Sequence, residues 1–188
     1  MSELATAPSP EARAYTASLI ATLGTRDPVE VLRTTPAGLR AGVQGLASRE
    51  LATPEAPGKW SLAQLIQHLE HSEMVGAFRF RMVLAHDRPV IPPYDQDLWV
   101  AGIPAAADDA AAAVAAALDN IDVLRRSLVG VLARHSPAQR GRVGLHAERG
   151  EESIDHMARM YAGHDLVHLR QMARIRAAAT GRAVGASS

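Results

Sequence analysis

The sequence contains no cysteine among its 188 residues. This absence excludes disulfide bonds, thiolate metal ligands and a cysteine nucleophile, so any thiol chemistry has to use a thiol from another molecule. Lysine is almost absent as well, because Lys59 is the only one and the other basic residues are arginine. We interpret that bias as compositional rather than chemical.

The chain also lacks an excess of charge of either sign and a long apolar run. Lys and Arg total 20, and Asp and Glu total 20, so there is no overall attraction to phosphate backbones or anionic lipids. The longest apolar run, around Ala110–Leu118, is too short to span a bilayer. The first residues do not have the pattern of a secretion signal. We therefore expect a cytoplasmic protein without a nucleic-acid or membrane partner.

The sequence predicts one all-α domain. A length of 188 residues suits a single buried core, so we expect one domain over residues 1–188, with flexible tails at about 1–10 and 181–188. No alternating run of β-branched residues is long enough to predict a sheet. Helical spacing of apolar residues predicts helices at 11–23, at 29–47 with an interruption near Pro36, and at 61–85, 107–134 and 153–179.

The start of the third helix is especially well marked. Ser61 and Gln64 have the spacing of a capping box, and Trp60 can pack against Leu65 as a hydrophobic staple. The phase of this helix is therefore secure. Two long loops, 86–104 and 135–152, exceed the usual connections of a helical bundle, a length that is typical of functional or mobile segments.

The strongest chemical signal is the pair His164 and His168. Four residues apart, two imidazoles lie on one face of a helix and can share a metal ion. Both fall at the centre of the apolar stripe of the last helix, where unpartnered imidazoles would be unfavourable. The alternative is that each is a core histidine with an ordinary hydrogen bond.

A third metal ligand has to come from another helix, because no His, Asp or Glu follows His168. His156 lies eight residues before His164 and points away from the stripe. On the 61–85 helix, His68 flanks the apolar face and His71 points almost to the opposite side. His68 is therefore the better third ligand, although a histidine at a helix interface would look the same.

The other candidates carry less weight. Asp165 stands where the zinc-protease pattern H-E-x-x-H has its glutamate, and no G-x-S-x-G motif indicates a serine hydrolase. Asp95 and Asp97 are typical of loop capping. Tyr161 shares the face of the histidine pair, but we interpret it as a core residue and assign no general base. We expect a surface or loop position for the remaining histidines, which are His71, His86, His135, His146 and His156.

Several blocks of sequence occur in a recognisable order. They are Gly58–Ser61, which runs on to His68, then Pro93–Trp99, His146–Gly150 and Tyr161–Leu169. This set resembles the DinB-like superfamily, most closely its YfiT-type branch, with Ala147 where a proline is usual. The resemblance covers the chain from about Gly58 to Met172. These ordered blocks with matching ligand positions are specific together, whereas each alone is weak.

The resemblance implies an up-and-down four-helix bundle, often a homodimer, with one metal ion. Carried over residue by residue, its ligands are His68, His164 and His168, the same set that the helical phases select. Members of the family have been described as metal-dependent hydrolases. Relatives include transferases and isomerases that use a low-molecular-weight thiol such as bacillithiol or mycothiol.

These observations lead to three functional hypotheses. Three neutral imidazoles suit a divalent transition metal with open positions, with zinc or nickel as our expectation. Our leading hypothesis is transfer of an external, bacillithiol-like thiol to a small electrophilic molecule. The alternative enzyme is a hydrolase that uses metal-bound water. The non-enzymatic alternative is an interaction module in which the metal only stabilises helix packing.

Overall fold

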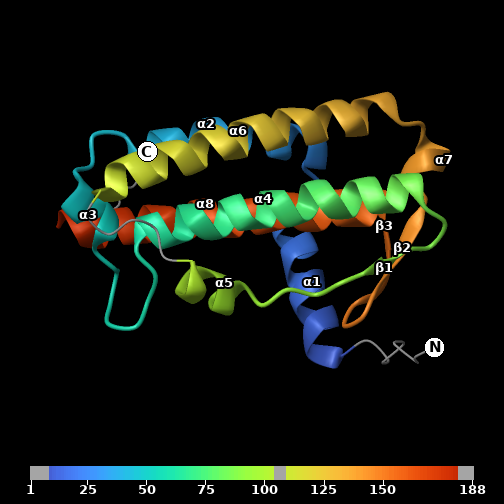
Figure 1. Cartoon of the computed structure of the whole chain (residues 1–188), viewed down its shortest axis with the longest axis horizontal. Coiled ribbons are helices and arrows are strands. Elements are labelled where there is room, and N and C mark those ends of the chain that lie inside the picture. The colour runs from blue at the N-terminus through green and yellow to red at the C-terminus, as the bar shows by residue number, and fades with distance from the viewer. Residues whose placement is uncertain (1–8, 104–108, 182–188) are drawn as a thin grey trace.

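The computed structural model describes residues 9–103 and 109–181, and its main feature is a bundle of four long helices (Figure 1). These helices are α2 (Pro28–Val43), α4 (Leu62–Ala85), α6 (Ala110–Arg134) and α8 (Ile154–Thr180). A further helix, α1 (Pro10–Leu23), packs against α8. Shorter helices occupy the connections, namely α3 (Ser48–Ala52), α5 (Gln96–Gly102) and α7 (Pro137–Arg140). The predicted all-α four-helix bundle is confirmed.

The four helices do not strictly alternate in direction, so the up-and-down order that the family resemblance implies is not found. The side chains of Glu70 and Asn120 are hydrogen bonded, and Arg81 binds Ser127 farther along both helices, so α4 and α6 run parallel. Helices α2 and α8 are likewise parallel neighbours, antiparallel to the other two (Figure 1). The order is therefore up, down, down, up. The long connection between α4 and α6 makes this possible, because it returns the chain to the end of the bundle where α4 begins.

The predicted helix boundaries agree with the structure to within a few residues in four of the five cases. Residues 107 and 108 of the predicted fourth helix, and most of the two predicted tails, lie outside the described residues. The Ser61 capping box is present: its hydroxyl accepts from the Gln64 N–H at 3.3 Å, and its own N–H donates to Gln64 Oε1 at 3.0 Å. This cap fixes where α4 begins.

The prediction for α2 was wrong in two respects. The helix ends at Val43 instead of continuing to residue 47, and it is not interrupted at Pro36, which lies inside it. Proline has no N–H, so it cannot donate to the carbonyl four residues earlier, that of Leu32. In this structure Nη1 of Arg125 donates to that carbonyl at 3.0 Å. The acceptor freed by Pro36 is thus satisfied by another helix.

Arg125 connects all four helices of the bundle. Besides Leu32 on α2, its guanidinium contacts Glu73 on α4, with Nε donating to Oε2 at 3.0 Å, and Asp165 on α8, with Nη1 donating to Oδ2 at 2.5 Å. All three charged side chains are almost completely buried. Burial opposes the charge on Arg125, but the carboxylates of Asp165 and Glu73 outweigh it and raise the pKa of Arg125. We call Glu73, Arg125 and Asp165 the polar layer.

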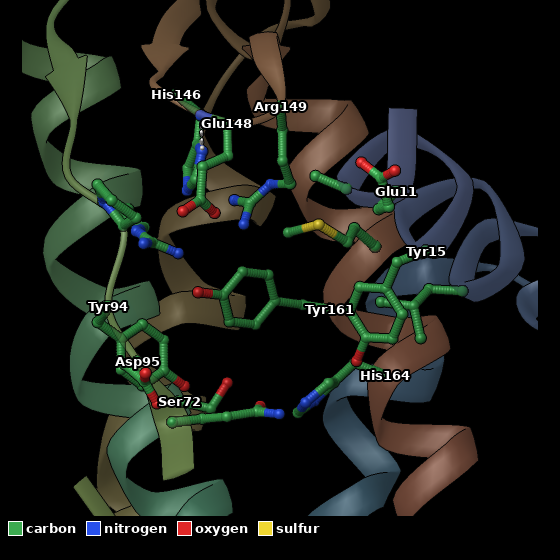
Figure 2. Close-up of a pocket in the computed structure, with 16 residues that line it drawn as sticks. Glu11, Tyr15, Ser72, Tyr94, Asp95, His146, Glu148, Arg149, Tyr161 and His164 are labelled. Atoms are coloured by element: carbon green, nitrogen blue, oxygen red, sulfur yellow. Dashed lines mark hydrogen bonds between the residues drawn. The ribbon is translucent and has the colours of Figure 1, made fainter. Parts of the chain in front are cut away.

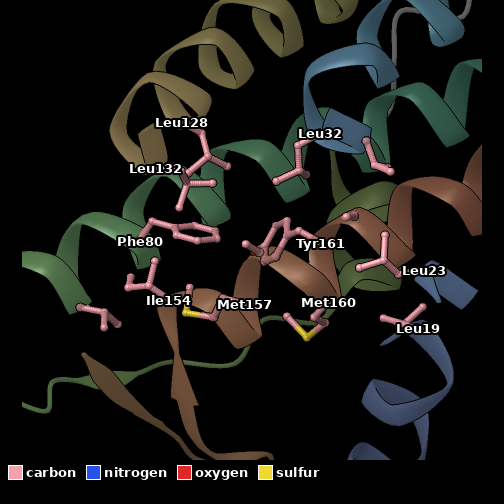
Figure 3. Packing of buried hydrophobic residues seen from close by; sticks show 14 of the residues in the cluster. Leu19, Leu23, Leu32, Phe80, Leu128, Leu132, Ile154, Met157, Met160 and Tyr161 are labelled. Atoms are coloured by element: carbon pink, nitrogen blue, oxygen red, sulfur yellow. The ribbon is translucent and has the colours of Figure 1, made fainter. Parts of the chain in front are cut away.

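The polar layer separates two apolar clusters. One contains the later part of α4 and of α6 and the first turns of α8, with Phe80 stacked edge-on against Tyr161 at 5.7 Å between ring centres (Figure 3). The other contains the first half of α4 and of α6 and the later part of α8. Burial of these apolar side chains is the main stabilising force of the bundle. The layer between them fixes the relative register of the helices.

A small sheet joins the two long loops, which the sequence did not predict. Strand β2 (Val143–His146) pairs in parallel with β1 (Val90–Ile91) and in antiparallel fashion with β3 (Gly150–Ser153). The loops 86–104 and 135–152 are therefore tied together at one end of the bundle (Figure 1). Within the described residues, no helix has the length and apolar character that crossing a membrane requires.

Helix α1 approaches α8 closely at Gly163. A Cβ atom at this glycine would lie 2.0 Å from the carbonyl oxygen of Leu19. The contact therefore requires a residue without a side chain, directly before His164.

Replacing Arg125 with Ala should lower the free energy of unfolding by about 3–5 kcal/mol, because two buried carboxylates would lose their partner. Arg126→Ala is the matched control, since Arg126 is exposed on the same helix, and it should change stability by less than about 0.5 kcal/mol. Urea unfolding followed by circular dichroism measures both. Equal unfolding midpoints for the two variants would contradict the role of the polar layer.

Gly163→Ala should destabilise the protein by about 1–3 kcal/mol, because the added methyl group overlaps the backbone of α1. Gly130→Ala provides the control: its new Cβ would meet only the flexible side chain of Arg134, and alanine favours a helix over glycine by about 0.5–1 kcal/mol. Thermal unfolding should thus shift in opposite directions in the two variants. A stabilised Gly163→Ala protein would rule out the close approach.

Candidate metal centre and adjoining cavity

The three predicted histidines converge in the interior of the bundle. Nε2 of His164 lies 3.1 Å from Nε2 of His68 and 3.0 Å from Nε2 of His168. His68 comes from α4, and the other two come from α8 one turn apart. The structure thus brings together, from two helices, the three side chains that the sequence selected. Among the described residues, this is the one group of three or more His, Asp and Glu with ligand atoms close enough for a metal ion.

A hydrogen bond fixes the orientation of His168. Its Nδ1 lies 2.9 Å from Oε1 of Gln171, and a carbonyl oxygen can only accept, so Nδ1 carries the proton. In a neutral imidazole the lone pair is then on Nε2, which faces His164. Such an outer hydrogen bond is typical of metal-binding histidines. The sequence analysis missed Gln171, although its position one turn after His168 was a usable signal.

All three imidazoles are kept neutral. Burial, followed by the neighbouring His168 and His71, lowers the pKa of His68 to about 3. Burial also lowers the pKa of His164 well below its ordinary value, with further contributions from His168 and His68. The pKa of His168 is lowered by burial as well. Neutral imidazole is the form that binds a metal ion.

The donor set fits a divalent ion. Three nitrogen ligands about 2.0–2.1 Å from one tetrahedral ion lie about 3.4 Å from one another, close to the separations of His164 from His68 and from His168. Without a cation, at most one of two facing Nε2 atoms can donate a hydrogen bond to the other. The Nε2 atom of the third histidine then keeps a lone pair without a partner. A shared ion would satisfy all three.

Trp60 packs against one of the three histidines. Its ring centre lies 5.0 Å from that of His68, and Trp60 precedes the cap of α4 by one residue. The tryptophan therefore packs against a candidate ligand, a contact that the sequence did not predict. Its packing against Leu65 as a hydrophobic staple stays a prediction.

A cavity of about 630 Å³ extends from His164, one of the three histidines, toward the small sheet. Its walls are α1, α4, α8, the residues before α5 and the turn between β2 and β3, and His164 is part of its lining. Figure 2 shows His164 and His146 on opposite sides of the cavity, with the Tyr161 side chain between them. The volume is in the range of small-molecule binding sites. The site can therefore admit a small molecule next to the histidine cluster.

Two histidines for which we expected a surface or loop position are buried instead. His71 is 6% exposed, with its ring edge-on to Trp99 at 5.3 Å, because α5 covers that side of α4. His146 is 3% exposed, at the end of β2 in the cavity wall. Both errors arose because the long loops fold back onto the bundle. His86 is exposed, and His135 and His156 are half-buried.

The remaining candidates have defined positions. Asp95 caps α5, with Oδ1 accepting from the N–H groups of Asp97 and Leu98 at 2.9 and 3.0 Å, as predicted. Tyr161 is buried. Its ring packs so closely against Gly76 that a Cβ atom added to this glycine would lie 2.8 Å from Cε1 of the ring. Burial raises its pKa, so the hydroxyl stays protonated at neutral pH and can donate a hydrogen bond.

Comparison with known proteins gives one family and several relatives. The family model described as the DinB superfamily matches residues 31–172. A protein of Oceanobacillus iheyensis is 31% identical over 134 residues, which cover 71% of this chain and 75% of the relative. A protein of Bacillus mycoides is 26% identical over 148 residues, which cover 79% and 83%. Both relatives carry the name "putative metal-dependent hydrolase".

A solved structure has the same fold. YfiT from Bacillus subtilis superimposes with a TM-score of 0.68 and 23% sequence identity, covering 89% of each chain. It is described as "a probable metal-dependent hydrolase with an unusual four-helix bundle topology". That likeness agrees with the order up, down, down, up found in this chain.

Untagged protein should contain about one equivalent of a divalent transition metal, and His68→Ala and His164→Ala should each lose it, because two imidazoles hold such an ion much more weakly than three. Helical circular dichroism should change little. His156→Ala, on α8 but outside the cluster, is the control and should keep the metal. Elemental analysis after gel filtration measures this, and unchanged metal content in both cluster variants would disprove the assignment.

Proposed function

The chain belongs to the DinB superfamily, and from this membership and the geometry of the histidine cluster we propose a metal-dependent enzyme with His68, His164 and His168 as the ligands. The cavity that reaches His164 carries this proposal. A metal with a purely structural role needs no adjoining space, so the cavity supports catalysis over a metal-stabilised interaction module. Zinc or nickel stays our prediction for the ion, and a homodimer stays a prediction from the family resemblance.

We propose transfer of a low-molecular-weight thiol to a small electrophile as the reaction. When bound, the metal supplies positive charge that lowers the pKa of a coordinated thiol or water. A free thiol has a pKa of about 8.5, and bulk water one of about 15.7, so a thiol needs much less help to lose its proton. The absence of cysteine from the chain means that this thiol has to be a second substrate.

The side chains around the cavity support this preference. Its carboxylates, among the described lining residues, are those of Glu11, Asp95 and Glu148, and all three are exposed. The buried carboxylates of Glu73 and Asp165 are engaged by Arg125. No free buried carboxylate therefore lines the described part of the cavity as a general base. A reaction with an intrinsically acidic nucleophile suits such a site best.

Residues of this chain position the reactants in the proposed reaction. The sulfur of the thiol forms a bond to the electrophilic carbon, the leaving group departs with its electron pair, and the thiol proton goes to solvent. The protonated hydroxyl of Tyr161 points into the cavity (Figure 2) and can donate a hydrogen bond to a polar group of the substrate. Trp60 packs against the ring of His68 and restricts its movement.

Hydrolysis by a metal-bound water is the second candidate. It is supported by the names of the relatives from Bacillus mycoides and Oceanobacillus iheyensis. The same ligands and the same cavity would serve it, and a bound water can reach a pKa of about 7 on a zinc ion without help from a protein base. The two reactions differ in whether turnover requires an added thiol.

Metal-loaded protein should conjugate bacillithiol, or another low-molecular-weight thiol, to 1-chloro-2,4-dinitrobenzene, with release of chloride. The rate of His164→Ala should be at least about 100-fold lower, a loss of about 2.7 kcal/mol of transition-state stabilisation. His156→Ala should keep the wild-type rate. Absorbance of the conjugate measures the rate. Hydrolysis of p-nitrophenyl acetate without thiol, combined with no conjugation by any thiol tested, would favour the hydrolase instead.

A further inference from the structure

A buried arginine in the cavity wall has no carboxylate partner. Arg79 on α4 is 3% exposed and lines the cavity. Its Nη2 donates to the backbone oxygen of Pro92 at 2.5 Å, and the guanidinium lies 5.7 Å from the ring centre of Tyr94. Its Nε has no hydrogen-bond partner, and no ion pair joins Arg79 to a carboxylate in the part of the chain that the structure describes.

The contrast with Arg125 shows what is missing. Arg125, equally buried, has two carboxylates and a carbonyl around it. A buried guanidinium without such partners is unfavourable, because it has lost its hydration without a compensating negative charge. In a cavity open to small molecules, a ligand can supply that charge.

His146 provides a second unpaired donor in the same wall. Its Nδ1 accepts from the backbone N–H of Glu148 at 3.2 Å, so the neutral ring carries its proton on Nε2. This Nε2 is buried and has no partner. Burial, followed by the charge of Arg149, lowers the pKa of His146 to about 4, with a smaller contribution from Arg79. At neutral pH the ring is therefore an uncharged donor.

The other charges near this wall are either paired or exposed. Arg149 is bound by Glu152, with Nε donating to Oε1 at 2.6 Å and Nη2 to Oε2 at 2.8 Å. The carboxylates of Glu11, Asp95 and Glu148 are exposed. Arg79 also shares a side-chain hydrogen bond with the hydroxyl of Tyr161. Among the described lining residues, the buried part of the cavity thus offers one positive charge without a carboxylate partner and one uncharged donor without a partner.

We propose that Arg79 and His146 form a subsite for an anionic oxygen group of the substrate, either a carboxylate or a phosphate. The planar guanidinium suits both groups. This inference rests on the proposed function for the reacting end of the substrate, because the same cavity ends at His164. It adds the chemical class of the other end of the substrate, which the proposed function does not specify.

The positions of the two ends define the shape of the substrate. Arg79 follows His68 by eleven residues on α4, which is roughly 16 Å along the helix axis. His146 and His164 likewise lie on opposite sides of the cavity (Figure 2). The substrate therefore has its anionic group separated from its reacting atom by a chain or ring of several bonds.

Isothermal titration calorimetry on the protein as purified should detect binding of hexanoate. The neutral analogue hexanamide should bind at least tenfold more weakly. Arg79→Met should reduce hexanoate affinity at least tenfold, and His146→Ala should reduce it severalfold. Arg81→Gln is the matched control, because Arg81 is exposed on the same helix, and it should bind as the wild type does. Inorganic phosphate, titrated in parallel, distinguishes a phosphate subsite from a carboxylate subsite.

A stability measurement keeps the test valid if a variant is damaged. Arg79→Met removes an unpaired buried charge, so the ligand-free variant should unfold at the same temperature as the wild type or higher. Hexanoate should raise that temperature only in the wild type. Equal binding of hexanoate and hexanamide without phosphate binding, or full anion affinity in Arg79→Met, would overturn the subsite.

The two proposals can fail independently. If the protein binds metal and conjugates thiols but shows no Arg79-dependent anion binding, the subsite is disproved and the proposed function stands. Arg79-dependent anion binding in a protein that takes up no metal would support the subsite and refute the metal-dependent reaction. A carboxylate bound directly to the metal would be recognised by its unchanged affinity in Arg79→Met, and this result counts against the subsite.

Discussion

The contact of Arg125 with Glu73, Asp165 and the carbonyl of Leu32 is the constraint on which the bundle depends. Apolar packing is not directional, so it specifies the register of four helices less sharply than hydrogen bonds do. A buried guanidinium with three fixed acceptors does specify it, because any shift would leave a buried charge unpaired. The register between α4 and α8 is therefore set at the level where His68 has to meet His164 and His168.

The same contact places negative charge beside the candidate metal centre. Asp165 directly follows His164, and together with Glu73 it contributes two buried carboxylates against one guanidinium. Burial raises the pKa of Glu73, and Arg125 opposes this effect. Three neutral imidazoles leave the charge of a divalent ion uncompensated. Asp165 acts on the pKa of His168 and Arg125 on that of His164, so the polar layer brings charges of both signs close to the site. Asp165 has a structural role here, which differs from that of the glutamate in the zinc-protease pattern.

Much of the fold and of the candidate site could be predicted from local sequence patterns. Helical periodicity and the Ser61 cap predicted the long helices, and the spacing of His164 and His168 predicted two of the three members of the cluster. The phase of α4 then selected His68. The bonds of Arg125 and the burial of His71 and His146 could not be predicted, because they depend on residues far away in the chain. The strands β1 to β3 were missed since they are only two to four residues long and exist through pairing between loops.

The parallel arrangement of α4 and α6 has a consequence for how this fold can diversify. A chain that returns to its starting end needs a long crossing segment, and here that segment and the hairpin β2–β3 supply much of the cavity wall. Neither contributes residues to the histidine cluster. Insertions and substitutions in them can therefore reshape the cavity wall while the helices that carry the histidine cluster stay unchanged, so the topology allows the two parts of the candidate site to change separately.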